Sequence, residues 1–75
     1  MAKLPLVSAQ EAIRALNKKG YVFDHQTGSH IILRNAAPPH RRLTVPNHKE
    51  IAKGTLRSII REAGLTVEEF VKLLD

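Results

Sequence analysis

Apolar residues recur at helical spacing near both ends of the chain, whereas the middle alternates between apolar and polar positions. In the first region, residues 9–16 carry one apolar face, and Ser8 with Glu11 matches the S-x-x-E sequence of a capping box. Gly20 can take the left-handed conformation that stops a helix. These features predict a first helix over roughly residues 8–19.

Three short segments with strand character follow, at residues 21–23, 29–34 and 41–45. A turn at residues 26–28 separates the first two, and a proline-containing loop at residues 35–40 separates the second from the third. Connections of these lengths suit antiparallel hairpins. The middle of the chain therefore predicts a three-stranded antiparallel meander.

Alternation assigns a face to each strand residue, because successive side chains point to opposite sides of a sheet. Ile31 and Leu33 would face the core, and His30, Ile32 and Arg34 would face the other way. In the third segment, the same reasoning directs Leu43 and Val45 inward and Arg42 and Thr44 outward.

Two further helices are expected after the strands. A helix beginning at Gly54-Thr55 would carry an apolar stripe and end at Gly64, and Thr66 with Glu69 would cap a short helix over residues 66–74. The order is that of an α+β fold, α-β-β-β-α plus a short C-terminal helix. The helices would cover one face of the sheet and leave the other in water. We expect residues 1–75 to form one domain, because so short a chain cannot build separate cores.

Composition narrows the range of functions. The chain of 75 residues has no cysteine, which excludes disulfides and cysteine-ligated metal centres. It also has no apolar run long enough to cross a membrane. From Arg14 to Arg61 there are ten basic residues and two acids, a local charge of 10 − 2 = +8 within a total of +5. Such a basic middle suggests a polyanion, most simply nucleic acid, although +5 is also ordinary for a small soluble domain.

The four histidines are His25, His30, His40 and His48. None is spaced from another as metal ligands on one helix would be, so the sequence predicts no metal site. A solvated surface position is the simplest interpretation of His25, His40 and His48.

His30 differs because it would project from the outward face next to a turn, on the same face as Arg34. A neutral imidazole can take the proton of a ribose 2′-hydroxyl, and nearby cations can neutralise charge developing on the phosphorus. Those parts suffice for RNA cleavage by internal transesterification without a metal. Gly28 reads first as a turn residue with positive φ, and it would also let a phosphate or ribose approach the backbone.

Lys53-Gly54-Thr55 resembles the end of a phosphate-binding loop, but the glycine-rich segment that precedes such a sequence in nucleotide-binding sites is missing. The three residues therefore indicate the start of a helix. Free N–H groups beside Lys53 could bind an anion, or the segment could be a plain cap. Arg57 and Arg61 share a face that is either solvated or part of a polyanion footprint. The few aromatic residues offer no platform for stacking bases.

Several short motifs occur together in one order along nearly the whole chain: Lys19-Gly20-Tyr21, Gly28-Ser29-His30, Thr44-Val45-Pro46 with His48, Lys53-Gly54-Thr55-Leu56-Arg57, and Ala63-Gly64-Leu65. This succession strongly resembles the HicA (YcfA-like) toxin family.

The resemblance implies a double-stranded-RNA-binding-domain-like fold and a toxin of a type II toxin–antitoxin module. Such a toxin cleaves mRNA without a metal or other cofactor, in the cytoplasm, and a HicB-type antitoxin blocks its site. The active histidine of the family corresponds to His30, and its lysine and glycine before the core helix correspond to Lys53 and Gly54. From this resemblance together with the basic residues, we expect a slow endoribonuclease whose general base or acid is His30. The expected RNA-binding residues are Gly28, Ser29, Arg34, Arg42, Lys53, Gly54 and Arg57.

Two alternatives remain open from the sequence. The chain could be a non-catalytic RNA-binding module of the same fold, in which case His30 would not affect RNA integrity. It could also be an interaction protein whose basic face docks an acidic partner. The second alternative is compatible with a toxin, because an antitoxin would use the same face.

Overall fold

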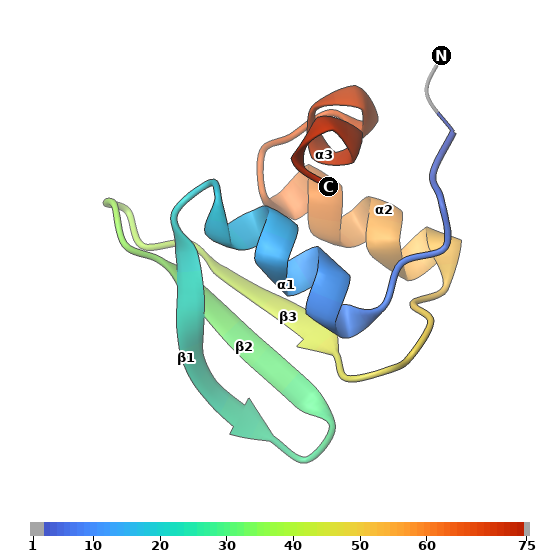
Figure 1. Cartoon of the computed structure of the whole chain (residues 1–75). Helices are drawn as coiled ribbons and strands as arrows, with labels where there is room; N and C mark the ends of the chain where they lie inside the picture. The colour runs from blue at the N-terminus through green and yellow to red at the C-terminus, as the bar shows by residue number, and fades with distance from the viewer. Residues whose placement is uncertain (1–2, 75) are drawn as a thin grey trace.

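The structure is a computed structural model that describes residues 3–74. The helices and strands follow in the expected order, which confirms the predicted α-β-β-β-α arrangement with a short C-terminal helix (Figure 1). Their bounds are α1 Ala9–Asn17, β1 Tyr21–Thr27, β2 His30–Asn35, β3 Arg42–Pro46, α2 Lys53–Glu62 and α3 Val67–Leu73.

Both predicted capping boxes are present. In α1, the backbone N–H of Glu11 donates to Ser8 Oγ at 3.1 Å, and the backbone N–H of Ser8 donates to Glu11 Oε1 at 2.9 Å. Thr66 and Glu69 make the same reciprocal pair at the start of α3, at 3.1 and 2.8 Å. These bonds satisfy backbone donors that a helix start otherwise leaves without partners. They explain why the starts of α1 and α3 were predictable.

The strands form one antiparallel sheet in the order β1-β2-β3, with the helices on one face (Figure 1). In register, Ile31 lies opposite Val45 and Leu33 lies opposite Leu43. All four of these side chains are buried under the helices, as alternation predicted. The result is a fold of the double-stranded-RNA-binding-domain type, with an outward sheet face that no helix of the described chain covers.

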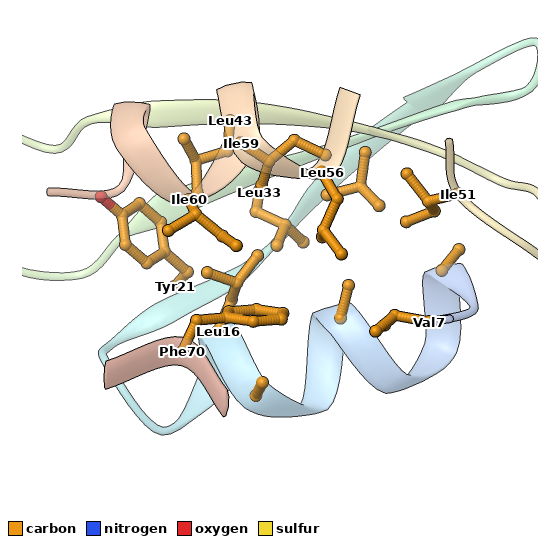
Figure 2. Close-up of a cluster of buried hydrophobic side chains, with 14 of the residues drawn as sticks. Val7, Leu16, Tyr21, Leu33, Leu43, Ile51, Leu56, Ile59, Ile60 and Phe70 are labelled. Atoms are coloured by element: carbon orange, nitrogen blue, oxygen red, sulfur yellow. The ribbon is translucent and has the colours of Figure 1, made fainter. Parts of the chain in front are cut away.

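Apolar side chains from both layers meet between the sheet and the helices (Figure 2). The third helix belongs to this core, because Phe70 is 0% exposed and α3 contacts both α1 and α2. Lys18 Nζ donates to the carbonyl oxygen of Leu73 at 2.9 Å, which places a cation at the C-terminal end of α3. The buried set is Leu4, Val7, Ala9, Ala12, Ala15, Leu16, Tyr21, Ile31, Leu33, Leu43, Val45, Ile51, Leu56, Ile59, Ile60 and Phe70.

The first hairpin differs from the sequence-based expectation. We expected the first strand to end at residue 23 and the turn to span residues 26–28, but β1 continues to Thr27 and the turn is Gly28-Ser29. The residues after Phe23 are polar and exposed, so they carried no apolar alternation to mark a strand. Their backbone pairing with β2 holds them in the sheet. Gly28, at φ 57°, begins a two-residue turn, and such turns are favoured when a glycine comes first.

Candidate functional site

The Gly28-Ser29 turn is fixed from two sides. The side-chain amide of Gln26 donates to the Gly28 carbonyl at 2.9 Å, and the backbone N–H of Asn47 donates to the Ser29 carbonyl at 2.7 Å. A Cβ added to Gly28 would meet no atom within 4 Å. The turn is therefore ordered and open, so a ligand can approach its backbone closely.

His30 is the first residue of β2 and projects from the outward face. In register it lies between Thr27 of β1 and Pro46 of β3, and its side chain is exposed. Within residues 3–74, no hydrogen bond or ion pair joins its imidazole to another side chain. The ring makes no contact of these kinds within the described residues and is accessible to a bound molecule.

Arg34 and Arg42 also lie on the outward face, directly opposite each other in the register of β2 and β3. They are less close to His30 than their shared face suggested. Arg34 is four positions from His30 along β2, which corresponds to about 13 Å at a rise of about 3.3 Å per residue. The two guanidinium groups therefore form a positive region at the far end of the face from the turn.

A pair of residues that the sequence analysis did not single out lies on the same face. Asp24 Oδ2 accepts a hydrogen bond from His25 Nδ1 at 2.8 Å. This hydrogen bond holds the pKa of the Asp24 carboxyl below its ordinary value, and the charges of Arg42 and Arg34 act in the same direction. The sequence analysis missed the pair, because a regular strand would direct two successive side chains to opposite faces, and the register of β1 shifts between Phe23 and His25.

The remaining expected RNA-binding residues lie on α2, in the helix layer on the other side of the sheet from His30 (Figure 1). Lys53 and Gly54 open this helix, whose N-terminus has no side-chain cap, and Arg57 is exposed one turn later. The six-residue connection from Pro46 to Lys53 joins this helix start to the end of the sheet that carries His30.

That connection is tied down along its length. Besides the bond from Asn47 to the turn, the His48 carbonyl accepts a hydrogen bond from the Ala9 N–H at 3.0 Å. The Ile51 N–H donates to the Val7 carbonyl at 2.8 Å. The structure thus divides the expected site residues into three groups: the turn with His30, the arginine pair, and the start of α2. One ligand could contact all three only if it were longer than a single nucleotide.

Across the described residues, no group of three or more histidine, aspartate and glutamate side chains is arranged to hold a metal ion. Nor does any helix between residues 3 and 74 combine the length and the apolar character needed to cross a bilayer.

The fold and the exposed histidine after a glycine turn define a class: a small α+β protein of the double-stranded-RNA-binding-domain type with an arginine pair on its outward face. The model of one family, described as the HicA toxin of bacterial toxin–antitoxin systems, matches residues 9–65 of the 75-residue chain. The chain belongs to the HicA toxin family. It is thus a toxin of a toxin–antitoxin module, with an antitoxin as its partner. No curated protein matches the sequence.

Proposed function

We propose that this toxin is an endoribonuclease that cleaves mRNA by internal transesterification, with His30 as general base or acid and no metal ion. The observation that carries the proposal is the situation of His30: an exposed imidazole, without a hydrogen-bonding partner in the described chain, beside an open glycine turn. Membership of a toxin family supports the proposal, because a toxin has to damage a molecule that the cell needs.

The reaction needs little from the protein, because RNA supplies its own nucleophile. His30 takes the proton of the 2′-hydroxyl as the 2′-oxygen bonds to phosphorus. The bond from phosphorus to the 5′-oxygen breaks, and that oxygen leaves with a proton. The products are a 2′,3′-cyclic phosphate and a 5′-hydroxyl. An enzyme with so few catalytic groups would be slow.

The RNA-binding residues would act at different points of one strand. Gly28 and Ser29 lie next to His30 and would contact the nucleotide that is cut. Arg34 and Arg42 would each bind a phosphate further along the strand, since Arg34 is about 13 Å from His30 along the face. The residues on α2 would bind the strand where it passes around the end of the sheet; they are Lys53, Gly54 and Arg57.

The antitoxin is proposed to be of the HicB type and to bind the same outward face. Its charge would then be complementary to the arginine pair, and its bound segment would exclude RNA from His30. Because the substrate is mRNA, the site of action would be the cytoplasm.

The test separates activity from folding. His30→Ala removes a general base, a change that typically lowers a rate about 10²–10⁴-fold. Because His30 is exposed, the free energy of unfolding of the variant should differ from that of wild type by less than about 0.5 kcal/mol. His40→Asn is the matched control, because His40 lies in the loop at the other end of the sheet and asparagine tolerates its φ of 60°. Equal RNA cleavage by wild type and His30→Ala would refute the catalytic role of His30. RNA binding without cleavage by either protein would leave a non-catalytic RNA-binding module.

A further inference from the structure

The pairing of β1 with β2 contains one irregularity, and it lies at Asp24. Phe23 is opposite Leu33, but the next paired residue on β1 is His25, opposite Ile32. Asp24 is the extra residue of a β-bulge. Bulges of this kind re-aim side chains and occur often next to active sites.

The bulge determines which face His25 occupies. Without the extra residue, the pairing of Phe23 with Leu33 would continue so that His25 lay opposite Ile31, whose side chain is buried against the helices. With the bulge, His25 lies opposite Ile32, on the outward face. Asp24 faces the same side, because its carboxylate reaches His25 Nδ1 at 2.8 Å and senses the charges of Arg42 and Arg34.

His25 and His30 are then diagonal neighbours on this face. His30 is directly opposite Thr27, which is two residues beyond His25 on the same strand. Diagonal neighbours in an antiparallel sheet are separated by about 7–8 Å, within reach of aromatic side chains. Both imidazoles are exposed, so a phosphodiester can lie between them.

The hydrogen bond with Asp24 also fixes which nitrogen of His25 is available. An ionised carboxylate can only accept hydrogen bonds, so Nδ1 carries the proton in this pair. Nε2 is left to face solvent and any bound molecule. This is how a carboxylate sets the tautomer and orientation of a histidine that transfers protons.

We propose that His25 is the second acid–base residue of this site, with Asp24 as its positioning residue. This inference rests on the proposed ribonuclease function. It names the residue that protonates the departing 5′-oxygen, which that proposal does not assign. His30 takes the proton of the 2′-hydroxyl while Nε2 of protonated His25 gives its proton to the departing 5′-oxygen. His25 ends neutral and His30 ends protonated, and exchange with water restores both.

The experiment compares two substrates that differ in the leaving atom. One is an ordinary RNA linkage, and the other carries sulfur in place of the bridging 5′-oxygen. A thiolate leaves without protonation, so loss of a general acid matters only for the oxygen substrate. His25→Ala should cleave the oxygen substrate about 10²-fold or more slowly than wild type, and should cleave the sulfur substrate at nearly the wild-type rate. His30→Ala should be slow on both substrates.

Asp24→Asn tests the positioning role, because an amide no longer fixes the tautomer of His25. It should show a smaller loss on the oxygen substrate and none on the sulfur substrate, whereas a purely structural role would slow both equally. His40→Asn again serves as the control with wild-type rates.

Three outcomes would overturn the assignment in distinguishable ways. Wild-type cleavage of the oxygen substrate by His25→Ala would remove His25 from the chemistry. Equal loss on both substrates would make it a binding or folding residue. If wild type cleaves neither substrate, or if His30→Ala cleaves both normally, the proposed function itself fails and this inference fails with it.

Discussion

Replacing Phe70 tests whether the third helix is part of the fold's core or an appendage to it. The helix lies outside the segment matched by the family model, which ends at residue 65. Yet Phe70 is 0% exposed and belongs to the same buried cluster as Leu16 and Ile60 (Figure 2). Truncating a fully buried phenylalanine to alanine costs about 3–5 kcal/mol, through lost burial and the cavity that remains.

That loss is large against the stability available. At about 0.05–0.15 kcal/mol per residue, a chain of 75 residues has a free energy of unfolding of about 4–11 kcal/mol. Phe70→Ala should therefore lower the Tm by at least about 12 °C, since each kcal/mol corresponds to about 4–8 °C in a domain of this size. Urea unfolding followed by circular dichroism gives the free energy directly.

Lys72→Ala is the matched control on the same helix, because Lys72 is exposed and its loss should cost less than about 1 kcal/mol. If Phe70→Ala were also to cost less than about 1 kcal/mol, α3 would not be part of the core and the packing described here would be wrong.

Three other predictions concern the turn, the caps and the arginine pair. Gly28→Ala should lower the free energy of unfolding by about 1–2 kcal/mol in urea titrations, because alanine is strained at φ 57° even with open space around its Cβ; an unchanged midpoint would contradict this. Hydrogen bonds from the backbone and hydroxyl of Thr66 hold the pKa of Glu69 below its ordinary value of 4.5, so its contribution to stability is present above that pH and is lost as the pH falls through the folded-state pKa. Glu69→Gln should therefore flatten the acid side of a plot of Tm against pH, and an unaltered acid limb would count against the capping box. Replacing both Arg34 and Arg42 with alanine should reduce the slope of log affinity against log salt for single-stranded RNA by about 1.4, because each lost phosphate contact contributes about 0.7. If Arg14→Ala reduced this slope by the same amount, the effect would be one of general charge.

The sequence predicted those parts of the fold whose local chemistry is strong. The capping residues Ser8 and Thr66 marked the starts of α1 and α3, and both boxes are present. The glycine stops were also correct, since Gly20 and Gly64 have φ values of 88° and 79°. Alternation in β2 assigned Ile31 and Leu33 to the core because that strand is packed against the helices on one face only.

The first strand was predicted less well because its residues are not selected by burial. Only Tyr21 of β1 is buried, and Phe23 is 60% exposed even though it lies opposite the buried Leu33. The length and the bulge of β1 are determined by its backbone pairing with β2. Backbone pairing places no demand on side-chain type, so the sequence of β1 shows no regular pattern. For the same reason, His25 looked like any solvated histidine until the register placed it diagonal to His30.

The candidate site was predictable where it coincides with a local motif and not where it depends on strand register. The Gly28-Ser29-His30 motif directed attention to one end of one strand, and the exposed outward position of His30 follows from alternation. The pairing of Arg34 with Arg42, and the diagonal placement of His25 relative to His30, could be seen only in the folded chain, because both depend on strand register.

The most direct test of the central claim is to identify the ends of RNA cut by the purified toxin in excess EDTA, for wild type and His30→Ala. We predict fragments ending in 2′,3′-cyclic phosphate and 5′-hydroxyl with wild type, and uncut RNA with His30→Ala. Fragments with 3′-hydroxyl and 5′-phosphate ends, or the same cyclic ends from both proteins, would contradict internal transesterification driven by His30.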